Sequence, residues 1–295
     1  MLGVAAAADR RPQKNMSEII FRCTVSAILG IFTHLALLSI PYFFGAFSLF
    51  FQIISSVAVV LIAVIVGQLV RRFLGVRASA PAFLIFHMIF IWLAYIIIIA
   101  RTAAFSPFTN ILFNVIYVFV LNGYFRMLFR DPGSLDISTE EASLPARVRY
   151  CKSCKAHILG FDHHCPAFGN CIGQKNHVLF MVLLVGFILL ETLYTLIAYQ
   201  WIKNEIHQAS NTEIAKCLVV STMIFSLVQV LWQLPFFMWH VYCVCFNIKS
   251  DEWINWRKYP EFHDTVRPSP SSSEIRFRNP YNKGIYSNLK SFLQL

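Results

Sequence analysis

Cysteine and histidine side chains gather in one polar stretch in the middle of the chain. Seven of them stand between positions 151 and 171, namely Cys151, Cys154, His157, His163, His164, Cys165 and Cys171. A short polar segment buries too little apolar surface to hold its shape, and zinc bound by Cys and His supplies the missing folding energy. A lone C-x-x-C pair is weak evidence for a metal, but here H-H-C and a further cysteine follow it. The pattern therefore predicts a zinc site rather than a set of unbound thiols.

Tetrahedral zinc takes four ligands, so the segment has side chains to spare for a second task. Residues 162–165 read Asp-His-His-Cys, which places an acid, two imidazoles and a thiol in consecutive positions. A nucleophilic cysteine needs a base, and the base needs an acid that orients it. All three types are present, so the pattern is typical of nucleophilic catalysis beside a metal. The spacing leaves open which histidine would bind zinc and which would act as the base.

The composition of the whole chain indicates a membrane protein. Of its 295 residues, 57% are hydrophobic and only 14% are charged, whereas an ordinary soluble domain is about 45–50% apolar and about 25% charged. These values exclude a disordered chain and argue against a soluble two-domain enzyme. The eight cysteines are too few and too unevenly spread for a disulfide framework, which indicates a reducing compartment. The net charge of +10 indicates basic membrane loops rather than nucleic-acid binding.

Six segments reach the length of about 20 mostly apolar residues that a membrane span needs. We expect them at residues 23–41, 49–70, 81–100, 111–129, 178–202 and 217–246. The predicted fold class is therefore an all-α polytopic membrane protein, with a small zinc-braced cysteine-rich loop between helices four and five. The predicted domain plan is a cytosolic N-terminus at 1–22, four transmembrane helices at 23–129, a cytosolic cysteine-rich domain at 130–177, two transmembrane helices at 178–246 and a cytosolic C-terminal segment at 247–295.

The distribution of basic residues predicts the orientation in the membrane. Lys and Arg gather before the first span, after the second, between the fourth and fifth, and after the sixth. The other three loops carry little excess charge. With six spans, all basic loops fall on one face, which predicts that both termini and the Cys/His segment are cytosolic. The N-terminus lacks the pattern of a cleaved signal peptide.

The Cys/His segment resembles the cysteine-rich domain of the DHHC-type protein S-acyltransferases, also called palmitoyltransferases. The resemblance rests on D-H-H-C-P at 162–166, G-N-C-I-G at 169–173 and N-x-x-x-F at 176–180. D-P-G at 131–133 and Asn-Pro-Tyr at 279–281 extend it over most of the second half of the chain. This family implies a polytopic membrane enzyme that moves a long acyl chain from acyl-CoA, such as palmitoyl-CoA, to cysteines of membrane-associated proteins through an acyl-enzyme.

Matched by position, the resemblance implies a role for each residue of the segment. Cys165 would be the acylated nucleophile, His163 the base that activates it, and Asp162 the acid that orients the base. One structural zinc would be bound by Cys151, Cys154, His164 and Cys171. Adjacent residues of an extended turn point in opposite directions, so the two neighbouring histidines are able to serve two sites. By its position, Phe180 is the expected contact for the acyl chain.

The chain departs from the family pattern at several places. The family's first C-x-x-C pair is absent from this chain. Tyr150 replaces a histidine that the family usually has, and His157 replaces the cysteine that would complete a second zinc site. We therefore expect a single zinc, with His157 at the surface or hydrogen-bonded rather than a ligand. Ala167 replaces the tryptophan that usually follows the active-site proline. The family's T-T-x-E corresponds to residues 249–252, Lys-Ser-Asp-Glu, which keep only the glutamate.

Two other function classes fit parts of the sequence. One is a catalytically impaired, zinc-bearing membrane adaptor derived from the family, although an adaptor needs no Asp, His and Cys together. The other is a zinc-dependent transporter or channel, which predicts charges along several spans, and few are present. The sequence therefore predicts a protein S-palmitoyltransferase in an endomembrane of the ER or Golgi, or in the plasma membrane. Its partners would be acyl-CoA, cysteine-bearing membrane-associated proteins and the lipid bilayer, without nucleic acid.

A few polar or reactive side chains stand in or beside the apolar segments. Ionisable groups inside a membrane are costly, so we expect polar contacts between helices for four of them: His34, His87, Glu191 and His240. Cys243 and Cys245 follow closely at the cytosolic end of the sixth span. Juxtamembrane cysteines are sites of S-acylation, and the alternative is that both are small apolar fillers. The sequence does not separate these two interpretations.

Overall fold

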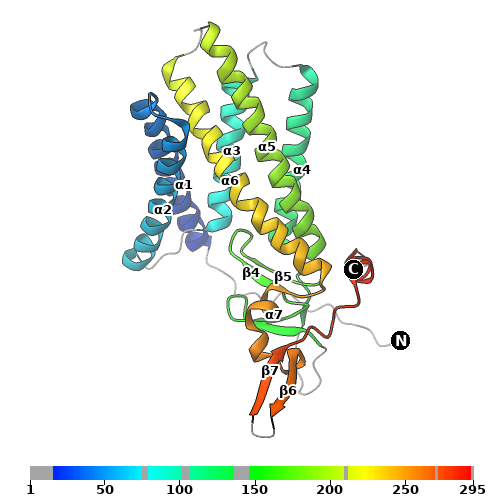
Figure 1. Ribbon diagram of the computed structural model, residues 1–295. Coiled ribbons are helices and arrows are strands. Elements are labelled where there is room, and N and C mark those ends of the chain that lie inside the picture. Colours follow the sequence, from blue (N-terminus) through cyan, green and yellow to red (C-terminus); the bar gives the residue numbers. More distant parts are fainter. Residues whose placement is uncertain are drawn as a thin grey trace, which may run out of the picture. The chain divides into compact units, whose positions relative to one another are not determined.

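Six long apolar helices dominate the computed structural model of the chain (Figure 1). The structure describes residues 16–74, 79–100, 106–135, 146–208, 212–269 and 272–293. The long helices are α1 (Met16–Phe44), α2 (Leu49–Leu74), α3 (Ala80–Ala94, continued by a π-helical turn at Tyr95–Ile99), α4 (Pro107–Phe129), α5 (His177–Gln208) and α6 (Glu213–Cys245). Each provides a stretch long and apolar enough to cross a membrane. The predicted fold class with about six transmembrane helices is confirmed.

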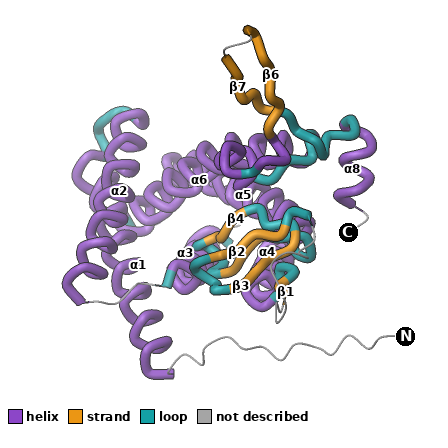
Figure 2. The backbone as a smooth tube through the Cα atoms, turned by 90° about the horizontal axis from the view of Figure 1, so that it is seen from below, coloured by secondary structure: helices purple, strands orange, loops and turns teal. Residues whose placement is uncertain are grey.

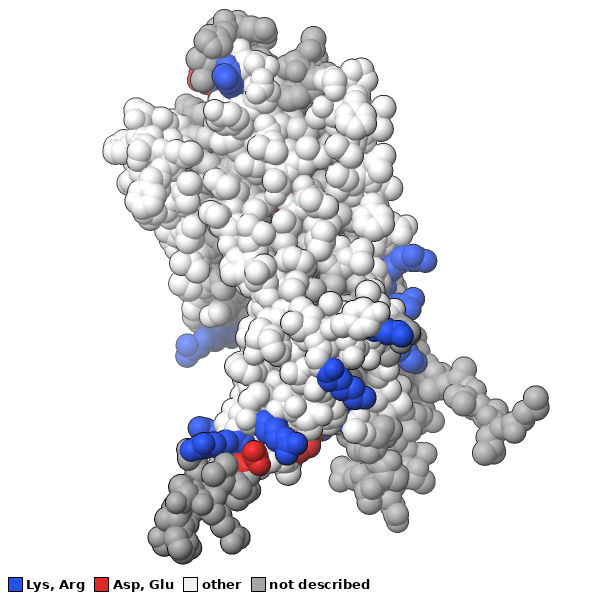
Figure 3. Space-filling model, turned by 45° about the vertical axis from the view of Figure 1, so that its right-hand side comes forward, with Lys and Arg blue, Asp and Glu red and all other residues white. Residues whose placement is uncertain are grey.

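The outer faces of these helices match a lipid environment. The apolar stretch of α2 is only 11% buried, and Leu61, Ile62 and Phe73 are among its exposed side chains. So large an exposed apolar surface is unfavourable in water and favourable in the hydrocarbon core of a bilayer. On the face shown in Figure 3, a wide surface is almost free of Lys, Arg, Asp and Glu side chains.

The chain divides into two compact units, and the first contains most of the apolar helices. It comprises residues 1–120 and 186–232, and in it α1 packs against α2 and α3. Polar contacts link its helices, as expected from the sequence. His34 Nε2 lies 3.2 Å from His87 Nδ1, and His87 Nε2 lies 3.7 Å from Glu191 Oε1. Three buried ionisable side chains from α1, α3 and α5 therefore meet in one place.

The second unit, residues 121–185 and 233–295, contains the cysteine-rich segment folded as two small antiparallel sheets. Strands β1 (Ser134–Leu135), β3 (Ala156–Leu159) and β2 (Val148–Cys151) form one sheet in that order. Strands β4 (His163–Cys165) and β5 (Asn170–Ile172) form the other, joined by a turn in which Gly169 has a φ of 57°. Figure 2 shows β1 to β4 gathered beside one another. These strands are too short to hold together by pairing alone.

Gly173, directly after β5, lies where three segments of backbone meet. A Cβ at this position would lie 2.6 Å from Ile158 Cγ2 and closer still to the carbonyl oxygen of Pro132. Because Ile158 is fully buried and the second neighbour is backbone, neither is able to move away. This close approach holds the D-P-G segment against β3 and β5.

We expect Gly173→Ala to destabilise the second unit, because overpacking at a rigid site costs about 1–3 kcal/mol. The measurement is the thermal unfolding midpoint of the detergent-solubilised protein. Gly67→Ala in α2 is the matched control, since its Cβ would meet only Leu29 Cδ1 at 3.9 Å. Equal midpoints for the two variants would contradict the close packing described for Gly173.

The C-terminal segment closes the second unit. It comprises α7 (Ser250–Asn255), two 3₁₀ turns (Trp256–Lys258 and Pro260–Phe262), the hairpin of β6 (His263–Ser269) and β7 (Ser272–Phe277), and α8 (Ile285–Leu293). Asn288 of α8 is buried, and its Nδ2 donates to the carbonyl oxygen of Cys245 at 2.8 Å. Cys243 packs against Ile248 and Phe262 and is 1% exposed, which favours the filler interpretation for this thiol.

Candidate active site and metal centre

Three cysteines and one histidine of the cysteine-rich segment form a compact cluster. They are Cys151 at the end of β2, Cys154 in the following turn, His164 in β4 and Cys171 in β5. Their ligand atoms all lie within 4.8 Å of one another. His164 Nδ1 is 3.8, 3.4 and 3.7 Å from the three sulfurs in chain order. Sulfur and nitrogen atoms at these separations fit around one tetrahedral ion. The cluster could therefore hold a single metal ion.

Local geometry explains why these four side chains meet. His164 and Cys171 are directly opposite in the register of β4 and β5, and the C-x-x-C turn brings the amide of Cys154 to 3.4 Å from Cys151 Sγ. The structure places His157 outside the cluster. It is opposite Tyr150 in the β2–β3 register, and the two rings lie 4.9 Å apart. Tyr150 and His157, two positions that a second zinc site would use, therefore form an aromatic pair.

The acid, base and thiol predicted from the sequence lie around β4. Asp162 is fully buried, and its Oδ2 accepts a hydrogen bond from His163 Nδ1 at 2.8 Å. Successive strand residues point to opposite faces, so His163 and Cys165 share one face and the intervening histidine takes the other. With its Nδ1 proton on the carboxylate, His163 is left with Nε2 to act on the thiol. The arrangement can carry out nucleophilic chemistry at the sulfur.

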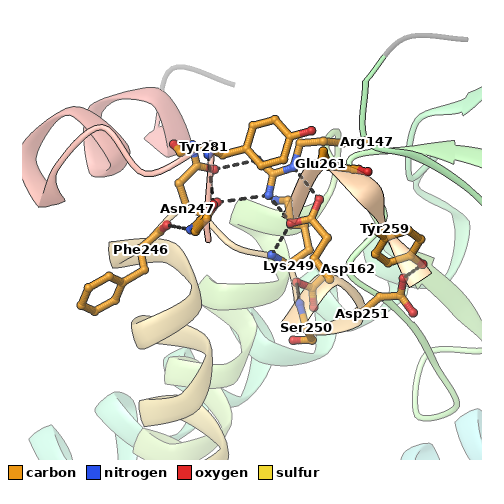
Figure 4. A network of polar contacts seen from close by, with 12 residues as sticks. Arg147, Asp162, Phe246, Asn247, Lys249, Ser250, Asp251, Tyr259, Glu261 and Tyr281 are labelled. Carbon is orange, nitrogen blue, oxygen red and sulfur yellow. Dashed lines mark hydrogen bonds and ion pairs between the residues drawn. The ribbon is translucent and has the colours of Figure 1, made fainter. Parts of the chain in front are cut away.

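Asp162 is held from several directions. Its Oδ1 accepts from the amide of Ser250 at 2.9 Å, and its backbone oxygen accepts from the amide of Asp251 at 3.0 Å. Backbone amides at the start of α7 therefore hold Asp162 by hydrogen bonds, as Figure 4 shows for Ser250. Its own amide donates to Ile172 O at 2.8 Å, which ties it to β5. The acid that orients His163 is fixed in place by backbone groups.

The electrostatics of the Asp162–His163 pair favour an ionised pair. Burial lowers the pKa of His163, but hydrogen bonding to Asp162 and to Cys165 outweighs it and raises the pKa to about 9. Burial raises the pKa of Asp162, but the hydrogen bond to His163 and the positive charges of His163 and Lys249 move it well below its usual range. His163 is therefore a strong base, and at neutral pH it would hold a proton that it takes from the Cys165 thiol.

Aromatic side chains surround the base. Phe180 of α5 is 3% exposed, and its ring lies 5.5 Å from that of His163. Phe168 is also buried and lies 5.4 Å from Tyr124, whose hydroxyl donates to the carbonyl oxygen of Ala167 at 2.9 Å. Phe168 thus packs beside the position at which the family usually has a tryptophan.

A polar network that the sequence did not reveal lies beside the acid of the site (Figure 4). Arg147 donates from Nε to Glu252 Oε1 at 2.7 Å and from Nη2 to Oε2 at 2.6 Å. Its Nη1 donates to Asn247 Oδ1 at 2.8 Å, and its guanidinium stacks 4.2 Å from the ring centroid of Tyr281. From the sequence alone, Arg147 is only one of the basic residues between the fourth and fifth apolar segments. The retained glutamate of the T-T-x-E position was the available signal for its partner.

We expect Glu252→Gln to reduce the free energy of unfolding by about 3–5 kcal/mol, because breaking a buried pair leaves an uncompensated charge. The Glu252 side chain is 2% exposed. Glu213→Gln is the control, since its partner Lys216 makes an exposed pair worth about 0.5 kcal/mol or less. Denaturant unfolding in detergent measures both. Similar losses for the two variants would show that the Arg147 network does not support the fold.

The comparison with known families identifies the domain. A family model described as DHHC palmitoyltransferase matches residues 137–257. That range holds the metal cluster, the Asp-His-His-Cys residues and α7. Residues 137–257 therefore match a DHHC palmitoyltransferase domain. This confirms the resemblance found in the sequence, and together with the six apolar helices it makes the chain a multi-pass membrane protein.

Several curated proteins are similar to part of this chain. Palmitoyltransferase ZDHHC17 of Mus musculus is 30% identical over 179 residues, which cover 56% of this chain and 27% of the relative. Palmitoyltransferase akr1 of Schizosaccharomyces pombe is 28% identical over 46% of this chain and 26% of the relative. Probable protein S-acyltransferase 15 of Arabidopsis thaliana is 28% identical over 50% of this chain and 56% of the relative. The match spans about a quarter of the length of the first two relatives.

Proposed function

We propose that this protein is a protein S-acyltransferase that forms an acyl-enzyme on Cys165. It takes a palmitoyl-type chain from acyl-CoA and passes it to cysteine thiols of membrane-associated proteins. The observation that carries this proposal is the 2.8 Å contact of Asp162 with His163, on the strand that also bears Cys165. A non-catalytic adaptor has no use for a buried acid that orients a base beside a thiol.

The reaction follows from these three side chains in two steps. His163 accepts the thiol proton of Cys165, and the sulfur attacks the thioester carbonyl of acyl-CoA. The carbon–sulfur bond to CoA breaks, and the departing thiolate takes the proton from His163. A substrate thiol then gives its proton to His163 and attacks the new thioester, which returns Cys165 as a thiolate that regains this proton. Asp162 keeps His163 in the required tautomer throughout and stabilises its positive charge.

The metal in this proposal is one structural zinc ion. Cys151, Cys154, His164 and Cys171 would hold it, and all four protein ligands fill the tetrahedral positions. Zinc supplies folding energy to the short strands that carry the nucleophile. Its thiolate-rich donor set suits zinc better than the harder cations Mg²⁺ and Ca²⁺.

The membrane placement completes the proposal. Basic loop residues favour an orientation with the DHHC domain and both termini in the cytosol, in an endomembrane of the ER or Golgi, or in the plasma membrane. Phe180 lies in the first turn of α5, and its ring contacts that of His163, so an acyl chain that enters between the helices would contact the Phe180 ring. Palmitoyl-CoA and cysteine-bearing membrane-associated proteins would meet Cys165 at the membrane surface.

Acyl-enzyme formation tests this function directly. Purified full-length protein in detergent would be given an alkyne-tagged palmitoyl-CoA, and the labelled protein would be treated with neutral hydroxylamine. We expect one label per chain, released by hydroxylamine because it is a thioester. A folded, metal-loaded sample that takes no label would overturn the proposal and favour the adaptor.

We expect Asp162→Asn to slow acyl-enzyme formation by about 10²–10⁴-fold, because the amide favours the wrong tautomer of His163 and stabilises no positive charge. Single-turnover labelling measures the rate. Asp251→Asn is the matched control, since that carboxylate bonds Tyr259 and Asn255 rather than the base. Equal rates for the two variants would remove Asp162 from the mechanism.

A further inference from the structure

Three buried polar side chains behind Asp162 have no role in the mechanism above. They are His177 at the start of α5, His240 in α6 and Lys249 before α7, exposed by 1%, 1% and 9%. Ligand-type atoms of Asp162, His177 and His240 all lie within 4.8 Å of one another. His177 Nε2 and His240 Nδ1 are buried without a hydrogen-bond partner in the described part of the chain. A buried polar atom without a hydrogen-bond partner destabilises the fold, so its presence calls for an explanation.

Two interpretations suit this cluster, a second metal site or a hydrogen-bonded support for the carboxylate. Lys249 decides between them. Its Nζ lies 3.1 Å from His177 Nδ1, and an ammonium group only donates. His177 Nδ1 must therefore accept, and the ring proton is left on Nε2. A protonated Nε2 has no lone pair to offer a metal ion. The positive charge of Lys249 also disfavours a metal cation beside it. The contact makes His177 a proton donor rather than a ligand.

We propose that Lys249 is a positioning residue of the acyl transfer, which acts on Asp162 through His177. Lys249 donates to His177 Nδ1, and His177 presents its Nε2 proton to the space that it shares with the Asp162 carboxylate and His240. This buried donor keeps the carboxylate turned toward His163. The inference rests on the proposed S-acyltransferase function and adds a second layer of support behind its acid.

Lys249 is itself held firmly. Its amide donates to Glu252 Oε2 at 2.9 Å, and the same carboxylate pairs with Arg147. A cavity of about 190 Å³ lies beside its side chain, lined also by His177, Cys243 and Asn288. The backbone is therefore fixed while space remains around the side chain. A longer side chain with the same charge is able to fit.

The charged and titratable groups that face Lys249 come from several elements. They are Arg147 before β2, Asp162 before β4, Glu252 in α7, the imidazoles of His177 and His240, and the thiol of Cys243. Burial and Arg147 lower the pKa of Lys249, and the two carboxylates oppose them, so that the pKa falls to about 8. The cation is therefore present at neutral pH and is lost as the pH rises through about 8. An arginine at this position would stay charged.

Lys249→Met and Lys249→Arg on the full-length protein test the proposal. We expect Lys249→Met to lower the maximal single-turnover rate of acyl-enzyme formation by about 10–100-fold, with the KM for palmitoyl-CoA unchanged, because positioning acts on the chemical step. Lys249→Arg should keep most of the rate near pH 7. The wild-type rate divided by that of Lys249→Arg should fall between about pH 7 and about pH 9, as only the lysine loses its proton.

Controls separate positioning from folding. Lys258→Met removes an exposed lysine that bonds Asn255 and should leave the rate unchanged. Unchanged metal content and a monodisperse elution would show that each Lys249 variant is folded. If Lys249→Met fails to fold, the ratio of wild type to Lys249→Arg across pH decides alone. A wild-type rate in Lys249→Met, equal losses in both variants, or a constant ratio across pH would overturn the inference.

Two further outcomes are distinct from these. A wild-type protein without thioester label would contradict the proposed function itself. The alkylation rate of Cys165 by iodoacetamide, followed by mass spectrometry, would then test the support, and an equal rate in Lys249→Met would overturn it. Two metal ions per chain, with one lost in His240→Ala, would also overturn the inference and assign the cluster to a second metal.

Discussion

Cys165→Ser is expected to abolish the hydroxylamine-sensitive label from alkyne-tagged palmitoyl-CoA, with a fall in rate of at least about 10³-fold. The physical reason is that the substitution replaces the proposed nucleophilic sulfur by a hydroxyl oxygen. A serine hydroxyl is far less readily deprotonated than a thiol, and His163 is tuned to work on sulfur. The side chain is buried and the substitution is nearly isosteric, so the fold and the metal cluster should persist. A change of this kind isolates the chemistry from the stability.

The other cysteines supply controls for this result. Cys245→Ser alters a half-buried thiol at the C-terminal end of α6 and should retain the label. Any label that remains on Cys165→Ser and resists hydroxylamine would be an oxyester on the new hydroxyl. A hydroxylamine-sensitive label that persists would instead place the acyl group on another cysteine, and the proposed nucleophile would be wrong. Equal metal content in all samples shows that folded proteins are being compared.

The sequence predicted what depends on local order along the chain. Apolar runs of about 20 residues have few alternatives to membrane helices, so the number of helices was available. It also follows locally that the side chains of His163 and His164 face two different sides, because adjacent residues in β4 point to opposite faces. The resemblance supplied the roles, and the structure brings those residues together.

Contacts between residues far apart in the chain could not be predicted from the sequence. Ser250 is 88 positions from Asp162, and Glu252 is 105 positions from Arg147, so no spacing rule links them. The replacement of the family's threonine by Lys249 was visible, but its meaning depends on His177 in another helix. His240 was expected to make an ordinary contact between helices, and the structure places its Nδ1 3.9 Å from Asp162 Oδ2. A single chain shows such residue types but not which elements close over them.

The second large effect is expected at the metal cluster. Cys171→Ser should reduce the metal content from about one ion per chain to near zero and abolish acyl-enzyme formation. Cys171 is fully buried, and it stands opposite His164 in a pair of three-residue strands. Structural zinc contributes about 10–16 kcal/mol in small zinc-dependent folds, so strands this short do not persist without it. Inductively coupled plasma mass spectrometry measures the metal, and labelling with alkyne-tagged palmitoyl-CoA measures the activity.

His157→Ala tests the same prediction from the opposite side. His157 lies between two of the candidate ligands in the chain, yet its ring packs on Tyr150 and it stands outside the cluster. The variant should therefore keep one ion per chain and most of the activity. Loss of metal in His157→Ala, or two ions in the wild type, would contradict a single site. Because β4 carries the proposed metal ligand between the proposed base and the proposed nucleophile, loss of the ion should disorder both of these side chains at once, and the metal content should fall together with the acyl-enzyme.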